Sequence, residues 1–151
     1  MATAWKSLSL LAAVALVLSL GVAVVPMISQ AEGSDPSCTC GDICVNTTGW
    51  WRGGGTFNAS STPIQDAVNN ATSGETICVG DGTYHESVNV NTSHLAIRSQ
   101  NGTANCIVNA SSSNDHVFAV TANYVNISGF TVQNATGNYT AGICLWDVVD
   151  H

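Results

Sequence analysis

Residues 75–104 read ETICVGDGTYHESVNVNTSHLAIRSQNGTA, and residues 105–132 read NCIVNASSSNDHVFAVTANYVNISGFTV. When the second stretch is written below the first, apolar residues fall at the same positions, thirty residues apart. The five matched pairs are Ile77 with Ile107, Val88 with Phe118, Val90 with Val120, Leu95 with Val125, and Ile97 with Ile127. A repeat of this length is typical of proteins whose units bury their apolar faces only by stacking on one another.

Each repeat contains three strand-like runs, which are separated by the turn-forming residues Gly, Asn, Ser and Asp. The expected strands are residues 76–79, 87–90 and 95–99 in the first repeat, and 106–109, 117–120 and 125–127 in the second. Three short strands per repeat, joined by turns rather than helices, predict an all-β parallel β-helix of about two to three coils. The alternative is a β-sandwich, whose short strands also recur every ~8–12 residues.

One amphipathic helix is expected immediately before the first repeat. Residues 62–65, TPIQ, combine a capping box with proline at the first helical position. Four apolar residues then fall on one helix face: Ile64, Ala67, Val68 and Ala71. Gly74 supplies a stop signal. The sequence therefore predicts a helix over residues 62–72, laid as a cap across the open end of the first coil.

The N-terminal residues 1–31 have the features of a secretory signal peptide. Lys6 precedes an apolar run over residues 8–25, and Ser29-Gln30-Ala31 is a small-x-small cleavage site. The run is nearly long enough to span a bilayer, so an uncleaved membrane anchor is the alternative. The predicted domains are the signal peptide at 1–31, an irregular Cys- and Gly-rich leader at 32–61, and the N-terminal part of a β-helix domain at 62–151. The expected location is secreted or on the extracellular cell surface.

All six cysteines lie after the expected cleavage site: Cys38, Cys40, Cys44, Cys78, Cys106 and Cys144. An even number in an exported chain predicts disulfides, although their connectivity does not follow from sequence. The thirty-residue register places Cys78 and Cys106 roughly 8 Å apart between Cα atoms, so no bond is expected between them. The spacing C-x-C-x3-C lacks the second ligand pair of a zinc site, and no metal is predicted.

Cleavage after Ala31 leaves two arginines against ten carboxylates, a formal charge of 2 − 10 = −8. A chain this acidic is not expected to bind nucleic acid or anionic lipid. A membrane contact is expected only if the N-terminal segment stays uncleaved.

The chain contains nine N-x-[ST] sequences, about three times the number expected from its composition. Because Asn, Ser and Thr are all turn residues, some of these occurrences arise by coincidence. The excess in an exported chain nevertheless predicts N-glycosylation. The candidate acceptors are Asn46, Asn58, Asn70, Asn91, Asn101, Asn109, Asn126, Asn134 and Asn138.

A polar corner cluster is the one candidate for chemistry. The thirty-residue register lays His85 over Asp115 and Glu86 over His116, and adjacent coils lie ~4.8 Å apart. Such pairs could act as general acid and base or as a weak metal site. Polar residues are also what a solvated corner needs, and this interpretation is favoured. No catalytic residue, metal or cofactor is therefore predicted.

The stretch from Ile77 to Val90, ICVGDGTYHESVNV, resembles the first coil of the right-handed parallel β-helix proteins of the pectin-lyase-like superfamily. The similarity rests on residues 82–84 (GTY), on Glu86 and on the flanking Ile and Val residues. Residues 64–68 are similar to the family's leading helix, and residues 126–132 to the end of its second coil. The superfamily includes NosD-type repeat proteins, archaeal surface proteins and, more distantly, pectin methylesterases and pectate lyases. The resemblance implies a right-handed coil over roughly residues 62–146.

Two functions are compatible with this resemblance. The first is a non-catalytic exported glycoprotein with a structural, adhesive or carbohydrate-binding role, whose partners are carbohydrate or other cell-surface proteins. The second is the N-terminal part of a polysaccharide-active enzyme of the pectinesterase or lyase type. Neither Arg52 nor Arg98 matches the catalytic arginine of the esterases, so the non-catalytic role is favoured.

Residues 142–146 look like the beginning of a third coil, with Ile143 in the place of Ile77 and Ile107. An unfinished coil would leave strand edges and core residues uncovered. Further coils or self-association are therefore expected at the C-terminal end.

Overall fold

The computed structural model describes residues 38–146, which contain twelve strands and one helix. The predicted signal peptide lies outside the described residues. The elements are β1 (Ile43–Asn46), β2 (Gly49–Arg52), β3 (Asn58–Ala59), α1 (Pro63–Asn70), β4 (Thr76–Val79), β5 (Gly82–His85), β6 (Val88–Val90), β7 (Ala96–Ser99), β8 (Cys106–Asn109), β9 (Phe118–Val120), β10 (Asn126–Ser128), β11 (Thr131–Gln133) and β12 (Ile143–Leu145). The prediction of an all-β chain with one short helix is confirmed.

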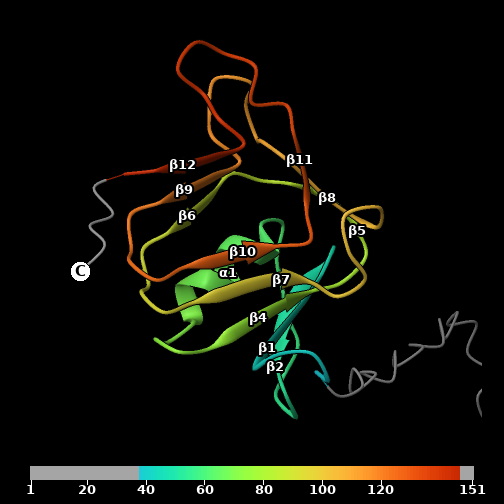
Figure 1. The fold of residues 1–151 in the computed structure, drawn as a ribbon. Coiled ribbons are helices and arrows are strands. Elements are labelled where there is room, and N and C mark those ends of the chain that lie inside the picture. Colours follow the sequence, from blue (N-terminus) through green and yellow to red (C-terminus); the bar gives the residue numbers. More distant parts are fainter. Residues whose placement is uncertain (1–37, 147–151) are drawn as a thin grey trace, which may run out of the picture. The chain divides into compact units, whose positions relative to one another are not determined.

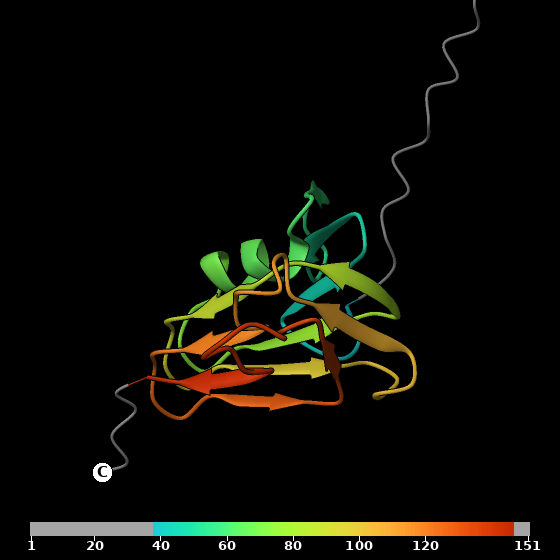
Figure 2. The same ribbon diagram turned by 90° about the horizontal axis from the view of Figure 1, so that it is seen from above.

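The strands form three sheets around one apolar core (Figures 1 and 2). Sheet A has the strand order β10-β7-β4-β1-β2-β3, sheet B has β11-β8-β5, and sheet C has β12-β9-β6. From β4 onward the chain visits sheets A, B and C in turn, three times over. We call each passage a circuit: β4-β5-β6, β7-β8-β9 and β10-β11-β12. Equivalent strands of successive circuits pair in parallel.

Sheet A owes its register to a row of isoleucines. Ile43, Ile77, Ile97 and Ile127 pair side by side on four neighbouring strands, β1, β4, β7 and β10. The first three are 0% exposed, and Ile127 packs against the core from the last circuit. Burying each such side chain stabilises the fold by about 1.5–3 kcal/mol. A shift of one residue would turn the whole row outward, so this row fixes the register.

The thirty-residue repeat is correct for only part of the chain. Sheets A and C confirm three of the pairs: Val88 with Phe118, Val90 with Val120, and Ile97 with Ile127. The Asn126 N–H donates to the Leu95 carbonyl at 2.9 Å, which places Val125 beside Leu95 at the same offset.

The pairing of Ile77 with Ile107 is wrong. Ile77 pairs with Ile97, only twenty residues away, whereas Ile107 lies in sheet B between Thr83 and Thr131. The strands β5 and β11 were not predicted. The loops between strands differ in length from one circuit to the next, so no single period applies to all three sheets.

The helix α1 forms where it was expected, but its N-terminus is capped differently. Its apolar face is buried against β1, β2, β4 and β6. Thr62 makes no side-chain capping hydrogen bond. The capping acceptor is Glu86, whose carboxylate lies 22 residues beyond Ile64 in the sequence. The predicted capping box is therefore wrong, and the helix start is set by a contact from another segment.

The leader before α1 is more ordered than the sequence indicated. β1 pairs in parallel with β4, and β2 pairs antiparallel with β1 to form a hairpin that extends sheet A. Ile43 and Val45 point into the core, whereas Cys44 faces the opposite side of the strand. These strands are too short to show a clear alternation, and their pairing depends on contacts distant in sequence. Within residues 38–146, no helix is long and apolar enough to cross a membrane.

Candidate functional site

The four residues of the predicted polar corner do not meet as His and carboxylate pairs. His85 pairs with Asn109 on β8, 24 residues away, and the Glu86 N–H donates to the Asn109 carbonyl at 3.0 Å. Asp115 and His116 belong to the loop that follows β8. The thirty-residue register that placed His85 over Asp115 is wrong here, because the sheet B repeat is shorter than the sheet C repeat.

Asp115 and His116 hold the loop in place through local contacts. A carboxylate oxygen of Asp115 accepts the His116 backbone N–H at 2.8 Å. The His116 Nδ1 atom accepts the Ala141 N–H at 3.0 Å, and its ring lies edge-on to Trp146 with centroids 5.9 Å apart. Both rings thus link the second circuit to the third. Among the described residues, no three His, Cys, Asp or Glu side chains are grouped to hold a metal.

Glu86 is the buried member of the four, with an exposed fraction of 1%. Its Oε1 accepts the Ile64 N–H at 3.1 Å and its Oε2 accepts the Gln65 N–H at 2.8 Å. The two donors are unpaired backbone groups of the first helical turn, which an anion stabilises. Burial raises the pKa of Glu86, and the two N–H groups oppose this rise. Glu86 therefore fastens α1 to the turn between β5 and β6.

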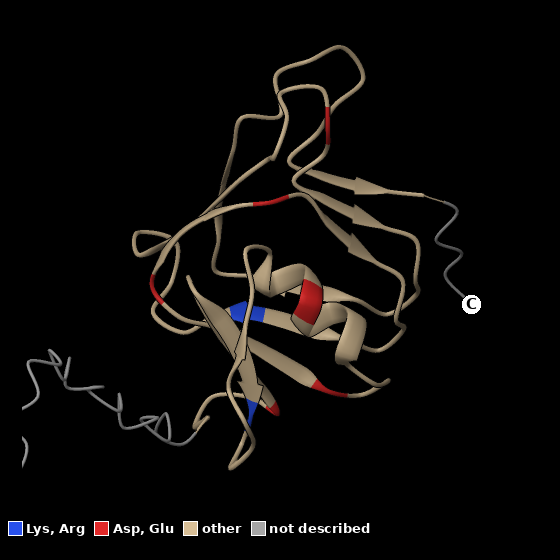
Figure 3. Cartoon of the chain, turned by 180° about the vertical axis from the view of Figure 1, so that it is seen from behind, with Lys and Arg blue, Asp and Glu red and all other residues tan. Residues whose placement is uncertain are grey.

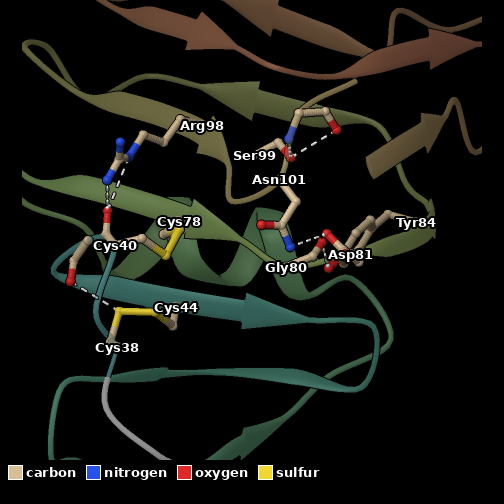
Figure 4. The surroundings of a disulfide bond; sticks show 12 residues. Cys38, Cys40, Cys44, Cys78, Gly80, Asp81, Tyr84, Arg98, Ser99 and Asn101 are labelled. Atoms are coloured by element: carbon tan, nitrogen blue, oxygen red, sulfur yellow. Dashed lines mark hydrogen bonds between the residues drawn. A yellow bond between two sulfur atoms is a disulfide. The ribbon is translucent and has the colours of Figure 1, made fainter. Parts of the chain in front are cut away.

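Two disulfides lie on the outer face of sheet A (Figure 4). Cys38 bonds to Cys44, and Cys40 bonds to Cys78 across 38 residues. Together with Trp51 they form a small apolar cluster separate from the main core. The Arg98 guanidinium donates to the Cys40 carbonyl and so ties β7 to the same segment.

The two remaining cysteines of the described residues, Cys106 and Cys144, are free. The prediction that Cys78 and Cys106 are not bonded is confirmed, although for a different reason. Cys106 faces the core from sheet B, in register with Gly82, while Cys78 lies in sheet A. Burial raises the pKa of the Cys106 thiol to about 11, so this thiol stays protonated at neutral pH.

Charged residues are sparse among the described residues (Figure 3). Arg52 forms an ion pair with Glu75 at 2.5 Å and donates to the Asn70 carbonyl at the end of α1. The hydrogen bond from Arg52 lowers the pKa of Glu75 to about 2. This ion pair joins β2, the end of α1 and the start of β4.

The candidate glycan acceptors are distributed over the surface of the described residues. Seven of the nine are exposed: Asn58, Asn70, Asn91, Asn101, Asn126, Asn134 and Asn138. Asn46 and Asn109 are half-buried, and the Asn109 Oδ1 atom is buried with no hydrogen-bond partner in residues 38–146. Asn126 lies within a strand, but its neighbour Ile127 faces the core, so the asparagine faces outward.

The prediction that residues 142–146 begin a third coil is wrong. Ile143 pairs with Phe118 in sheet C, so β12 completes the third circuit instead of beginning it. Ile143 and Leu145 continue the inward rows of Phe118 and Val120, yet their exposed fractions are 46% and 66%. The apolar core is thus only partly covered at this end of the described chain.

No family model, curated protein or solved structure matches this chain.

Proposed function

We propose that this chain is an exported, N-glycosylated cell-surface protein with a structural, adhesive or carbohydrate-binding role. The observation that carries the proposal is the exposure of seven of the nine candidate acceptor asparagines. Turn residues alone would be expected to place N-x-[ST] sequences in hydrogen-bonded turns. Here Asn126 instead lies in a strand with its side chain exposed to solvent.

The disulfides support export. Two disulfides in a chain of this size are typical of an oxidising compartment, such as the extracellular space. The longer bridge, between Cys40 and Cys78, ties the segment before β1 to the middle of sheet A. Such a bond would be reduced in most cytosols.

For the fold, we propose a right-handed parallel β-helix of the pectin-lyase-like type, with α1 as the cap of its first circuit. The repeated visits to sheets A, B and C support this assignment. The burial of Ile64, Ala67 and Val68 against β1, β2, β4 and β6 supports a capping role for the helix. The proposed partners are carbohydrate or other cell-surface proteins, with further coils or self-association at the end formed by β10, β11 and β12.

The proposal is tested by producing the full chain in secretory cells that add N-linked glycans. The mass of the secreted protein is measured intact, and the acceptor sites are identified by peptide mapping after proteolysis. We expect cleavage after Ala31 and glycans on several of the seven exposed asparagines, with Asn109 unmodified. A matched variant, Thr103→Ala, destroys the Asn101 acceptor sequence without removing the asparagine and should lose one glycan only. Secretion of a chain without any glycan, or retention of the first 31 residues, would overturn the proposal.

A further inference from the structure

The three sheets have six edge strands among the described residues. They are β3 and β10 in sheet A, β5 and β11 in sheet B, and β6 and β12 in sheet C. An edge strand presents unpaired backbone N–H and C=O groups with which another chain can pair. Natural sheets usually protect such edges with charged side chains, proline, bulges or covering segments. None of these six strands contains Asp, Glu, Lys, Arg or Pro. The β6 edge is covered by α1, whose Gln65 side chain accepts the Asn89 N–H and donates to the Asn89 carbonyl. The other five edges lack charged or proline protection.

Four of these six edges carry an exposed candidate glycan acceptor. Asn58 is the first residue of β3, and Asn126 is the first residue of β10. Asn91 directly follows β6, and Asn134 directly follows β11. All four side chains are exposed. The two acceptor sequences on interior strands behave differently, because Asn46 in β1 and Asn109 in β8 are only half-exposed.

We infer that N-linked glycans at the edge strands shield the sheets from pairing with other chains, an inference that rests on the proposed glycosylation. The shielded edges are those of β3, β10 and β11, through Asn58, Asn126 and Asn134, while Asn91 adds a sugar beside the β6 edge that α1 already covers. The edges of β5 and β12 have no acceptor and stay open. Association of the glycosylated protein is therefore confined to these two strands, so self-association at the end formed by β10, β11 and β12 takes place through β12 alone.

The geometry of an N-linked sugar suits this role. Glycosylation replaces one of the two hydrogens on Nδ2, and the other remains available as a donor. Asn134 therefore keeps its hydrogen bond to the Ala110 carbonyl, 3.3 Å from Nδ2, which holds the attachment point beside β11. A strand added to an edge lies ~4.8 Å from it, so its side chains must occupy the volume next to the acceptor. A hydrated, mobile glycan fills that volume and loses conformational freedom when a second chain approaches.

The chain has few charged residues that could keep the strand edges hydrated, so sugars at these positions would take over that role. Only 9% of the residues are charged, against about 25% in ordinary soluble proteins. Figure 3 shows the scarcity of charged residues on the strands of the third circuit. Glycans on the edges would supply the hydration that charged residues supply elsewhere.

The test compares three variants of the secreted, glycosylated full chain. The edge variant carries Ser93→Ala, Ser128→Ala and Thr136→Ala, which destroy the acceptor sequences of Asn91, Asn126 and Asn134 but leave the asparagines in place. The non-edge control loses three other glycans through Asn70→Gln, Thr103→Ala and Asn138→Gln. The sequence-preserving control carries Ser93→Thr, Ser128→Thr and Thr136→Ser. Light scattering gives the average mass of each protein at equal concentration, and circular dichroism checks the fold.

We expect the edge variant to have an average mass about twice that of either control, or more, because its edges can pair. A charge-bearing variant with Asn91→Asp, Asn126→Asp and Asn134→Asp should return to the mass of the controls. Equal masses for the edge variant and the non-edge control would overturn the inference, even if the protein is glycosylated. Peptide mapping that finds glycans elsewhere but none on these three asparagines would also overturn it. If the triple variant is not secreted in folded form, the same comparison is made with Ser128→Ala and Thr103→Ala alone.

Discussion

The carboxylate of Glu86 offers the sharpest test of how the helix is attached to the sheets. Replacing Glu86 with alanine removes the acceptor of both the Ile64 and the Gln65 N–H groups. The Ile64 residue is 0% exposed, so water cannot easily replace the lost acceptor. Replacing Glu86 with glutamine keeps one carbonyl oxygen of similar size and leaves one N–H facing the amide NH2 group.

The expected losses follow from these contacts. A buried donor left without a partner costs about 1–3 kcal/mol, and loss of a helix N-cap costs about 0.5–2 kcal/mol. We therefore expect Glu86→Ala to lower the free energy of unfolding by about 1.5–5 kcal/mol, and Glu86→Gln by about 1–3 kcal/mol. In a domain of this size each kcal/mol corresponds to about 4 °C in Tm.

The stability difference between the wild-type protein and Glu86→Gln should depend on pH, and the pKa shift of Glu86 gives the direction of that dependence. Burial raises the pKa of Glu86 above 4.5 in the folded state. A carboxyl group with a raised folded pKa contributes stability that is fully present below its unfolded pKa and is lost as pH rises through the folded pKa. The difference in stability between the wild-type protein and Glu86→Gln should therefore shrink as the pH rises from about 4.5 toward neutrality.

Urea unfolding followed by circular dichroism measures both effects, with Asp81→Ala as the control. Asp81 is an exposed carboxylate that accepts one hydrogen bond from Asn101, so its replacement should change stability by less than about 0.5 kcal/mol. If Glu86→Ala costs no more than Asp81→Ala, the carboxylate does not hold α1 in place. A difference between wild type and Glu86→Gln that grows with pH would refute the sign of the pKa argument.

Three further predictions concern the core, the ion pair and the longer disulfide. Ile97→Ala leaves a cavity in the middle of the isoleucine row and should lower the free energy of unfolding by about 3 kcal/mol, as measured in urea; a loss below about 1 kcal/mol would contradict the tight packing of that row. Glu75→Gln should cost about 1 kcal/mol near neutral pH, because its bond to Arg52 is partly exposed. Since the pKa of Glu75 is lowered to about 2, this cost should disappear as the pH falls from about 4.5 to 2, and a cost that persists at pH 2 would exclude the ion pair as its cause. Replacing Cys40 and Cys78 together with serine opens a loop with a sequence separation of 38, which corresponds to about 4 kcal/mol of lost stability in thermal unfolding; an unchanged Tm would show that the bridge is not formed.

The sequence predicted the strand bounds well where three apolar residues follow one another. Residues 76–79 and 106–109 were predicted with the bounds that β4 and β8 have. The strand β5 was missed because Gly82 and Thr83 are turn-forming residues, and only Tyr84 of its four residues is buried. Its inclusion in the sheet depends on pairing with β8, which cannot be seen from four residues alone.

The role of Glu86 shows what sequence reasoning could not reach. The residue was singled out twice, as part of a polar corner and as part of a family resemblance, and it proved to be the buried acceptor for α1. A capping box at Thr62 was the obvious local signal, and local signals carry no information about an acceptor 22 residues further along. An isolated carboxylate between the apolar positions Tyr84 and Val88 was the available hint, because an acid in a buried strand run needs a partner.

The error in the repeat has a physical cause that applies to stacked sheets in general. What must be conserved between circuits is the pairing of strands, not the length of the loops that join them. From β4 to β7 the offset is 20 residues and from β7 to β10 it is 30, while sheet B keeps 24 throughout. The thirty-residue period therefore holds from the second to the third circuit in sheet A and from the first to the second circuit in sheet C, and it is absent in sheet B. A functional pairing inferred from one period, such as His85 with Asp115, holds only if the loops on both sides of it have equal length, and here the loop after β8 breaks that condition.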